Sequence, residues 1–305
     1  MRITGNTTLL AIAAMVLAGG AAGCSSSDSA SGDASSAGSQ SSAAAVAKDE
    51  ALAAMVPAAI ASDGKLTVGT DASYAPSQFI GEDGTTIEGF DVDLVTAVGQ
   101  VLGLDVEMQN APFDSLVEGV KTGKFELGVS SFTINPERAQ QVDMPSYFSA
   151  GTSWAAPTGN PAGITPDNAC GRKIAVQKAT VQVDDITARS KACVDAGKQE
   201  ITIEQYQLQS DATAAVVSGK DDAMLADSPV VAYAIKQTGD KLQTVGDAYD
   251  AAPYGYAVPK GQGEYTAAIQ GALQKLMDDG TYLEILTSWG VQAGAITTSE
   301  LNPTS

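Results

Sequence analysis

Short apolar runs alternate with helical stripes of apolar residues from residue 65 onward. The runs have the length of buried strands and lie at residues 66–68, 87–90, 106–108 and 125–129. Between them, apolar residues recur at helical spacing over residues 91–102, where we expect Asp91 to cap the helix, and over residues 113–120. Strands that alternate with amphipathic helices predict right-handed βαβ units and a largely parallel sheet.

A second block of the same kind follows the loop at residues 157–166. Its expected strands and helices lie at residues 173–176, 181–194, 201–203, 212–217, 223–225 and 230–235. The chain then returns through a strand at 251–260 and a helix at about 266–277. These blocks predict an α/β fold of two lobes, in which the passages near 149–156 and 247–256 form a two-stranded hinge.

Polar residues gather where the expected strands end. In open α/β sheets, ligands bind beyond the carboxyl ends of the strands. In the first lobe these ends carry residues 71–74, 110–113 and 130–138, and in the second lobe they carry Thr180 and Asp227. We therefore expect polar strand ends of the two lobes to face each other across a cleft.

The stretch of residues 128–138 is the strongest candidate for chemistry. A strand leads into Asn135-Pro136-Glu137, which is typical of a helix start, and Arg138 lies in the first turn. The hydroxyls of Ser130, Ser131 and Thr133, free backbone N–H groups and a guanidinium together form a receptor for a carboxylate. The alternative is that Asn135 merely caps a helix and Arg138 is a solvated surface side chain.

The composition favours binding over catalysis. The chain of 305 residues has 17 basic and 36 acidic residues, a net charge of −19, so neither nucleic acid nor an anionic membrane surface is an expected partner. It contains no histidine, which excludes Ser/His/Asp machinery and histidine-ligated metals. We predict no cofactor and no metal. In an exported protein Cys170 and Cys193 are expected to form a disulfide, the alternative being two reduced thiols.

The first residues have the pattern of an export signal. Arg2 precedes an apolar run at residues 9–17, and small residues lead to Cys24. This end resembles a bacterial lipobox, with Ala21 in place of the usual leucine, which predicts a signal peptide at 1–23 and a lipid on Cys24. The alternative is plain secretion with an idle cysteine. Residues 25–47 are nearly all Ser, Ala and Gly, as in a flexible tether, and a short cap helix is expected by residue 61.

An ordered set of motifs spanning about residues 65–290 resembles the extracellular solute-binding proteins of bacterial polar amino acid ABC importers. The motifs are VGTDASYAP at 68–76, GFDVDL at 89–94, GKFEL at 123–127, NPERA at 135–139, VQKAT at 176–180, PYGYAVPK at 253–260 and DGTY at 279–282, with Trp289 after them. The resemblance implies a two-lobed periplasmic-binding-protein-like fold of type II. Its expected divisions are a tether and cap at 24–61, the first lobe at 62–152 and 253–292, the second lobe at 153–252, and a tail at 293–305.

The resemblance also implies a ligand-binding site. Arg138, helped by Ser131, Thr133 and the Thr180 turn, would hold an α-carboxylate. Asp227, with Thr133 and groups around Ser130, would hold the α-ammonium. Tyr74 and Phe113 would sandwich the ligand side chain, and Asp71 would lie near its head group. These roles suit a zwitterion, which needs one fixed cation and one fixed anion.

The implied function is that of a lipid-anchored receptor outside the cytoplasm. It would bind a free polar L-amino acid, close on it, and deliver it to a membrane permease, working as a monomer and catalysing no reaction. The alternatives are a cyclohexadienyl-type dehydratase on the same fold, with Asp71 or Lys178 as proton donor, and an extracellular amino acid sensor. Ala179 stands in place of the family's usual glycine, which alters the backbone approach to the carboxylate. Ser77-Gln78 in place of Phe-Glu leaves glutamine, glutamate or a basic amino acid open as the ligand.

Overall fold

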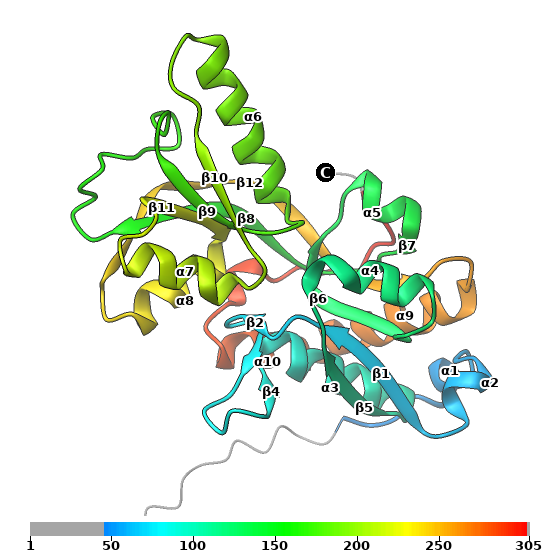
Figure 1. The fold of residues 1–305 in the computed structure, drawn as a ribbon. Helices are drawn as coiled ribbons and strands as arrows, with labels where there is room; N and C mark the ends of the chain where they lie inside the picture. The colour runs from blue at the N-terminus through cyan, green and yellow to red at the C-terminus, as the bar shows by residue number, and fades with distance from the viewer. Residues whose placement is uncertain (1–45, 304–305) are drawn as a thin grey trace, which may run out of the picture. The chain divides into compact units, whose positions relative to one another are not determined.

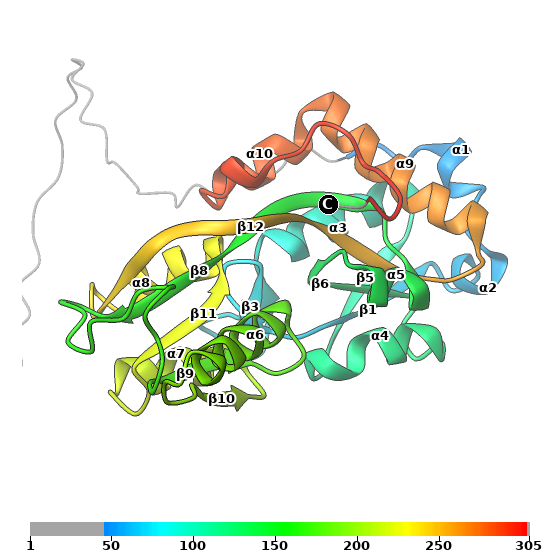
Figure 2. The same ribbon diagram turned by 90° about the horizontal axis from the view of Figure 1, so that it is seen from above.

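The computed structural model describes residues 46–303 (Figures 1 and 2). The expected signal peptide, the lipidated Cys24 and most of the tether lie outside the described residues and stay predictions. Within residues 46–303, no helix has the length and hydropathy that crossing a bilayer requires.

One large mixed sheet runs through both lobes. Its strands are β1 (Lys65–Thr70), β5 (Asp105–Asn110), β6 (Leu127–Thr133), β7 (Val142–Asp143), β8 (Ser146–Pro157), β9 (Lys173–Gln177), β10 (Thr202–Tyr206), β11 (Ala223–Asp227) and β12 (Leu242–Pro259). They follow the order β10-β9-β11-β8-β12-β6-β1-β5, with β7 paired to β12. In the first lobe β1 is parallel to β5 and β6, and in the second lobe β9 is parallel to β10 and β11. The predicted parallel α/β arrangement is confirmed.

The two long strands β8 and β12 connect the lobes. They pair antiparallel from Leu242 opposite Pro157 to Gly255 opposite Ser146, with several register shifts between. Figure 2 shows both strands passing from one lobe to the other. Because the chain crosses only twice along this pair, the fold is the expected two-lobed type with a two-strand hinge.

The first lobe has a core between its part of the sheet and the helices that cover it. These helices are α1 (Glu50–Ala53), α2 (Ala58–Ala61), α3 (Phe90–Leu102), α4 (Phe113–Lys121), α5 (Pro136–Gln141), α9 (Gly263–Asp279) and α10 (Thr281–Ser288). Buried residues of α3, α9 and α10 form one cluster with β1, β6 and β12, and Val56 and Ile60 of the N-terminal segment join it. The segment after β12 therefore completes the first lobe.

The start of α3 differs from the expectation. Gly89 is the N-cap, at φ 137°, and a Cβ there would lie 2.2 Å from the backbone oxygen of Ser77. Only glycine fits this close approach. The prediction that Asp91 caps the helix is wrong, since Asp91 lies inside α3 and its side chain bonds to Ser131 of β6 instead.

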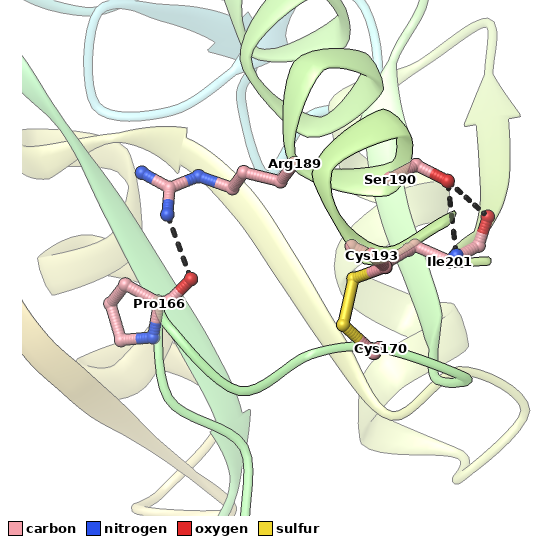
Figure 3. The surroundings of a disulfide bond; sticks show 6 residues. All are labelled: Pro166, Cys170, Arg189, Ser190, Cys193 and Ile201. Carbon is pink, nitrogen blue, oxygen red and sulfur yellow. Dashed lines mark hydrogen bonds between the residues drawn. A yellow bond between two sulfur atoms is a disulfide. The ribbon is translucent and has the colours of Figure 1, made fainter. Parts of the chain in front are cut away.

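The second lobe is built from α6 (Val181–Asp195), α7 (Gln209–Val217) and α8 (Ser228–Gln237) around β9, β10 and β11. The disulfide between Cys170 and Cys193 is present, with a Cα–Cα distance of 5.6 Å, and joins the C-terminal half of α6 to the loop before β9 (Figure 3). Arg189, also on α6, donates to the carbonyl of Pro166 in the same loop at 2.7 Å. The disulfide and this hydrogen bond tie the loop to the helix.

The strand expected at residues 87–90 is present as β4 (Ile87–Glu88), but it ends before Phe90, which begins α3. It does not join the large sheet: it forms a small antiparallel sheet with β3 (Gln78–Ile80) and β2 (Ser73–Tyr74), two strands not expected from the sequence. After α10 the chain forms the 3₁₀ helix η1 (Gln292–Gly294), and Glu300 then accepts a hydrogen bond from the backbone N–H of Ser146 at 2.8 Å. The C-terminal segment thus lies against the start of β8.

Candidate functional site

All the ligand-binding residues expected from the sequence line one cavity between the lobes. They are Asp71, Tyr74, Phe113, Ser130, Ser131, Thr133, Arg138, Thr180 and Asp227. The free volume of this cavity is about 10 Å³, about enough for one water molecule. The lobes are therefore closed on each other.

Arg138 reaches the cavity from the first lobe. Asn135 caps α5 by accepting from the backbone N–H of Arg138 at 2.8 Å, which fixes the base of the side chain. Its guanidinium donates to the carbonyl of Thr133 at 2.8 Å and, across the cleft, to the carbonyl of Ala179 at 3.1 Å. It also lies over the ring of Phe113, 5.3 Å from the centroid. Burial lowers the pKa of Arg138, while the nearby charge of Asp227 raises it. An anion placed beside this guanidinium would form a strong charge-assisted hydrogen bond with it.

Asp227 reaches the cavity from the second lobe, between β11 and α8. Its Oδ2 accepts from the hydroxyls of Tyr74 at 2.9 Å and Tyr254 at 2.6 Å, and its Oδ1 accepts from Gln182 at 2.8 Å. Burial raises the pKa of Asp227, and the hydrogen bonds together with the charge of Arg138 counteract the rise. A ligand ammonium would supply the nearby cation that a buried carboxylate needs.

Asp71 lies between the strand end of β1 and the second lobe and is 1% exposed. It accepts from the hydroxyl of Ser73 at 2.5 Å, from the backbone N–H of Phe113 at 2.9 Å and from the amide of Gln177 at 3.3 Å. Burial raises the pKa of Asp71, and the hydrogen bonds partly offset this. Among the described residues no Lys or Arg forms an ion pair with it, in contrast to seven other acidic side chains.

The aromatic pair lies on both sides of the cavity. Phe113, at the start of α4, stacks on Phe132 with centroids 5.2 Å apart and stays with the first lobe. Tyr74 packs among buried residues of the second lobe, such as Ala226 and Val230, while its hydroxyl meets Asp227. Tyr74 therefore connects the lobes in this closed form.

The hydroxyl groups of Ser130, Ser131 and Thr180 each hydrogen-bond to a different part of the protein. The Ser130 hydroxyl accepts from the backbone N–H of Asp71 and from Gln78, each at 3.1 Å. The Ser131 hydroxyl donates to Asp91 at 3.0 Å. Thr180 occupies the N-cap position of α6, but its hydroxyl donates to the carbonyl of Gln177 at 2.8 Å and makes no capping bond. In the first turn of α6, the backbone N–H of Val183 donates to the backbone carbonyl of Thr180 at 3.1 Å.

Gln177, Val181 and Gln182 also line the cavity and were missed from the sequence. Gln182 is 2% exposed and donates to both Thr152 and Asp227. A polar side chain in the first turn of a helix is expected to face solvent, so nothing in the sequence indicates that Gln182 lines the cavity. Tyr254 was quoted within a motif, but only the pairing of β12 beside β6 places its hydroxyl against Asp227.

The site provides one cation and one anion on opposite sides of a narrow cavity, with a second carboxylate nearby. This arrangement matches a zwitterion with a polar or cationic side chain. Among residues 46–303, no group of three His, Cys, Asp or Glu side chains lies together as a metal site would require.

The chain is similar to known proteins over nearly all of this two-lobed unit. It is 39% identical over 250 residues to the arginine-binding protein ArgT of Corynebacterium glutamicum, covering 82% of each chain. A solved ancestral arginine-binding protein bound to arginine matches at 32% identity with a TM-score of 0.68, covering 74% of this chain and 98% of that one. The arginine-, lysine- and histidine-binding protein ArtJ of Geobacillus stearothermophilus matches at 32% identity with a TM-score of 0.65, covering 74% and 95%.

The family model that matches is the one for bacterial extracellular solute-binding proteins, family 3. It covers residues 66–292, which includes every residue that lines the cavity. The chain belongs to this family of bacterial extracellular solute-binding proteins.

Proposed function

We propose that this protein is the amino-acid-binding component of an ABC importer and captures a free L-amino acid between its lobes. One observation carries the proposal: Arg138 of the first lobe and Asp227 of the second line the same cavity. Their charges suit the α-carboxylate and the α-ammonium of one ligand. The proposal is consistent with the arginine-binding relatives, whose names describe binding proteins.

The preferred ligand is a cationic amino acid, arginine first. Asp71 is a buried carboxylate in the cavity wall that lacks an ion-pair partner among the described residues, and a buried anion is stabilised by a cation. A guanidinium at the far end of the ligand would pair with it. ArgT, named an arginine-binding protein, supports this choice; an ancestral arginine-binding protein is solved with arginine and also with glutamine, so the titration below includes both.

The groups that would capture the ligand are hydrogen-bonded to other protein groups in the closed form. In the closed form Arg138 donates to Ala179, and Tyr74 donates to Asp227. Opening about the β8–β12 hinge breaks both hydrogen bonds and admits the ligand. Its charged ends then bond to Arg138 and Asp227 at once, so that occupancy favours the closed state of the lobes.

The partners of this cycle are a membrane permease and the lipid expected on Cys24. The protein would work as a monomer outside the cytoplasm and would catalyse no reaction. The dehydratase alternative needs a proton donor in the cavity. Lys178 is engaged by Asp114 at 2.7 Å and does not line the cavity, and Asp71 is held by three donors. No observation favours the dehydratase or the sensor.

The test is calorimetric titration of the purified protein with each of the twenty L-amino acids. We expect arginine to bind most tightly, and we expect Arg138→Ala to remove detectable binding while circular dichroism and unfolding remain those of a folded protein. Lys236→Ala, on α8 and away from the cavity, serves as a charge-matched control. Binding of arginine by the Arg138→Ala variant at wild-type affinity contradicts the assignment.

A further inference from the structure

Asp91 is a buried acid that does not line the cavity and that the proposed function leaves without a role. It is fully buried in the first turn of α3. Burial raises its pKa to about 7, and the hydrogen bonds from Ser131 hold the pKa below what burial alone would give. Burying a carboxylate costs folding free energy that its hydrogen bonds offset only in part, and an apolar side chain would avoid this cost.

Its hydrogen bonds lead to the binding site. One oxygen, Oδ2, accepts from both the backbone N–H and the hydroxyl of Ser131, each at 3.0 Å. These bonds join α3 to β6 over 40 positions of sequence. The contact is not helix capping, because Gly89 is the N-cap of α3.

Ser131 has an unusual backbone. Its φ is 49°, in the left-handed region that a residue with a Cβ rarely adopts. Such a conformation persists where surrounding contacts hold it. The two bonds to Asp91 are contacts of this kind, since they fix both the amide and the side chain of the same residue.

Ser130 and Thr133, which lie close to Ser131 along β6, contact the charged residues of the cavity. The Ser130 hydroxyl accepts from the backbone N–H of Asp71. The Thr133 carbonyl accepts from the guanidinium of Arg138. The turn at Ser131 therefore sets where the neighbours of Asp71 and Arg138 lie.

We propose that Asp91 is a positioning residue of the ligand site, which holds the left-handed turn at Ser131 so that Ser130 and Thr133 support Asp71 and Arg138. The proposal rests on the proposed function, because its main readout is amino acid affinity. Asp91 acts through Ser131 and does not touch the ligand.

The test compares two substitutions of Asp91 with a control in the same helix. Asp91→Ala removes the acceptor, and Asp91→Asn keeps one oxygen that can accept both bonds from Ser131. Val95→Ala shortens another fully buried side chain of α3, an apolar one that cannot hydrogen-bond to Ser131. Arginine affinity is measured by calorimetry, and thermal unfolding is measured without ligand.

We expect Asp91→Ala to weaken arginine binding by about ten-fold or more, as loss of hydrogen bonds to a charged acceptor implies. Asp91→Asn should restore binding to within about three-fold of wild type, since a neutral acceptor bonds less strongly than a charged one. Val95→Ala should lower the unfolding temperature and keep wild-type affinity. A merely structural role for Asp91 would not separate affinity from stability in this way.

A second readout needs no ligand. The ¹H–¹⁵N resonance of the Ser131 amide should move in Asp91→Ala far more than in Val95→Ala. The proposal is overturned if Asp91→Ala binds arginine as wild type does, or if Asp91→Asn or Val95→Ala loses as much affinity as Asp91→Ala. If the wild-type protein binds no amino acid, the proposed function fails. The Ser131 resonance, which needs no ligand, still tests whether Asp91 holds Ser131, so the two failures are distinguished.

Discussion

Replacing Asp71 by asparagine should change which amino acids this protein binds. The substitution keeps the shape of the side chain and removes its charge. An asparagine oxygen still accepts from the backbone N–H of Phe113 and from Gln177, while its NH₂ group donates to the Ser73 hydroxyl. The fold should therefore tolerate the change, and the effect should fall on the ligand.

The size of the effect follows from the burial of the site. Asp71 is 1% exposed, so a guanidinium that meets it forms a desolvated ion pair. Removing one partner of such a pair costs about 2–4 kcal/mol, which is about 30- to 1,000-fold in affinity. Glutamine presents only a neutral amide at this position, so its affinity should change by about 1 kcal/mol or less.

The assay is calorimetric titration of wild type and Asp71→Asn with arginine and glutamine at neutral pH. Asp93→Asn is the matched control, because Asp93 lies on the exposed side of α3 and accepts from the indole of Trp289 at 2.7 Å. We expect the control to bind both ligands as wild type does. The ratio of arginine to glutamine affinity should fall only in Asp71→Asn.

The pH dependence gives an independent measure of the same contact. The pKa of Asp71 is raised by burial, and a bound cation favours the ionised form. Arginine affinity should therefore decrease as pH falls toward this raised pKa, and the decrease should exceed that for glutamine. An equal loss of arginine and glutamine affinity in Asp71→Asn would refute the placement of the ligand head group at Asp71.

Three further predictions concern stability and closure. Asp91 has a folded pKa of about 7 against 3.8 ordinarily, so the folded state holds the extra proton between these values; stability should fall by roughly 4 kcal/mol as pH rises through this range. Urea titrations of wild type should show a larger fall than those of Asp91→Asn, in which Asp71 and Asp227, whose pKa values burial also raises, still contribute; parallel curves would contradict this. Replacing both Cys170 and Cys193 by serine removes a disulfide that joins residues 23 positions apart. The free energy of unfolding should fall by about 3 kcal/mol, and arginine affinity should not change. A matching loss of affinity would show that the disulfide also shapes the cavity. Asp114 accepts hydrogen bonds across the cleft from Lys178 at 2.7 Å and from Gln207 at 3.1 Å. Because this ion pair is partly exposed, Asp114→Asn should raise the dissociation rate of every bound amino acid by up to about five-fold. Stopped-flow rates that change for one ligand alone would contradict the role of Asp114 in closure.

Local sequence features predicted much of the first lobe's contribution to the site. Asn135 and Pro136 begin a helix by short-range chemistry, so the position of Arg138 in its first turn could be inferred. The alternation of strands and helices gave the parallel blocks, and the polar strand ends identified Asp71, Thr180 and Asp227 as residues of one cleft. The domain boundaries and the ligand-binding roles stay predictions.

Nonlocal contacts account for what the sequence did not reveal. Asp91 has the pattern of a helix cap, yet its partner is Ser131, which only the packing of α3 against β6 brings near. Gln182 and Tyr254 bond to Asp227 because α6 and β12 converge on the end of β11. Such contacts depend on where whole elements lie, and no local pattern encodes them.

The sequence by itself determined the strands, the helices, the charge types available at their ends and the family resemblance, because these depend on neighbours within a few residues. The tertiary structure alone decided that Arg138 and Asp227 share one closed cavity, that Asp71 is buried there without an ion pair among residues 46–303, and that Tyr74 bonds across the lobes. The reason is physical: burial and cross-lobe bonding are set by the closure of two units about β8 and β12, and closure brings together residues that are far apart in the chain.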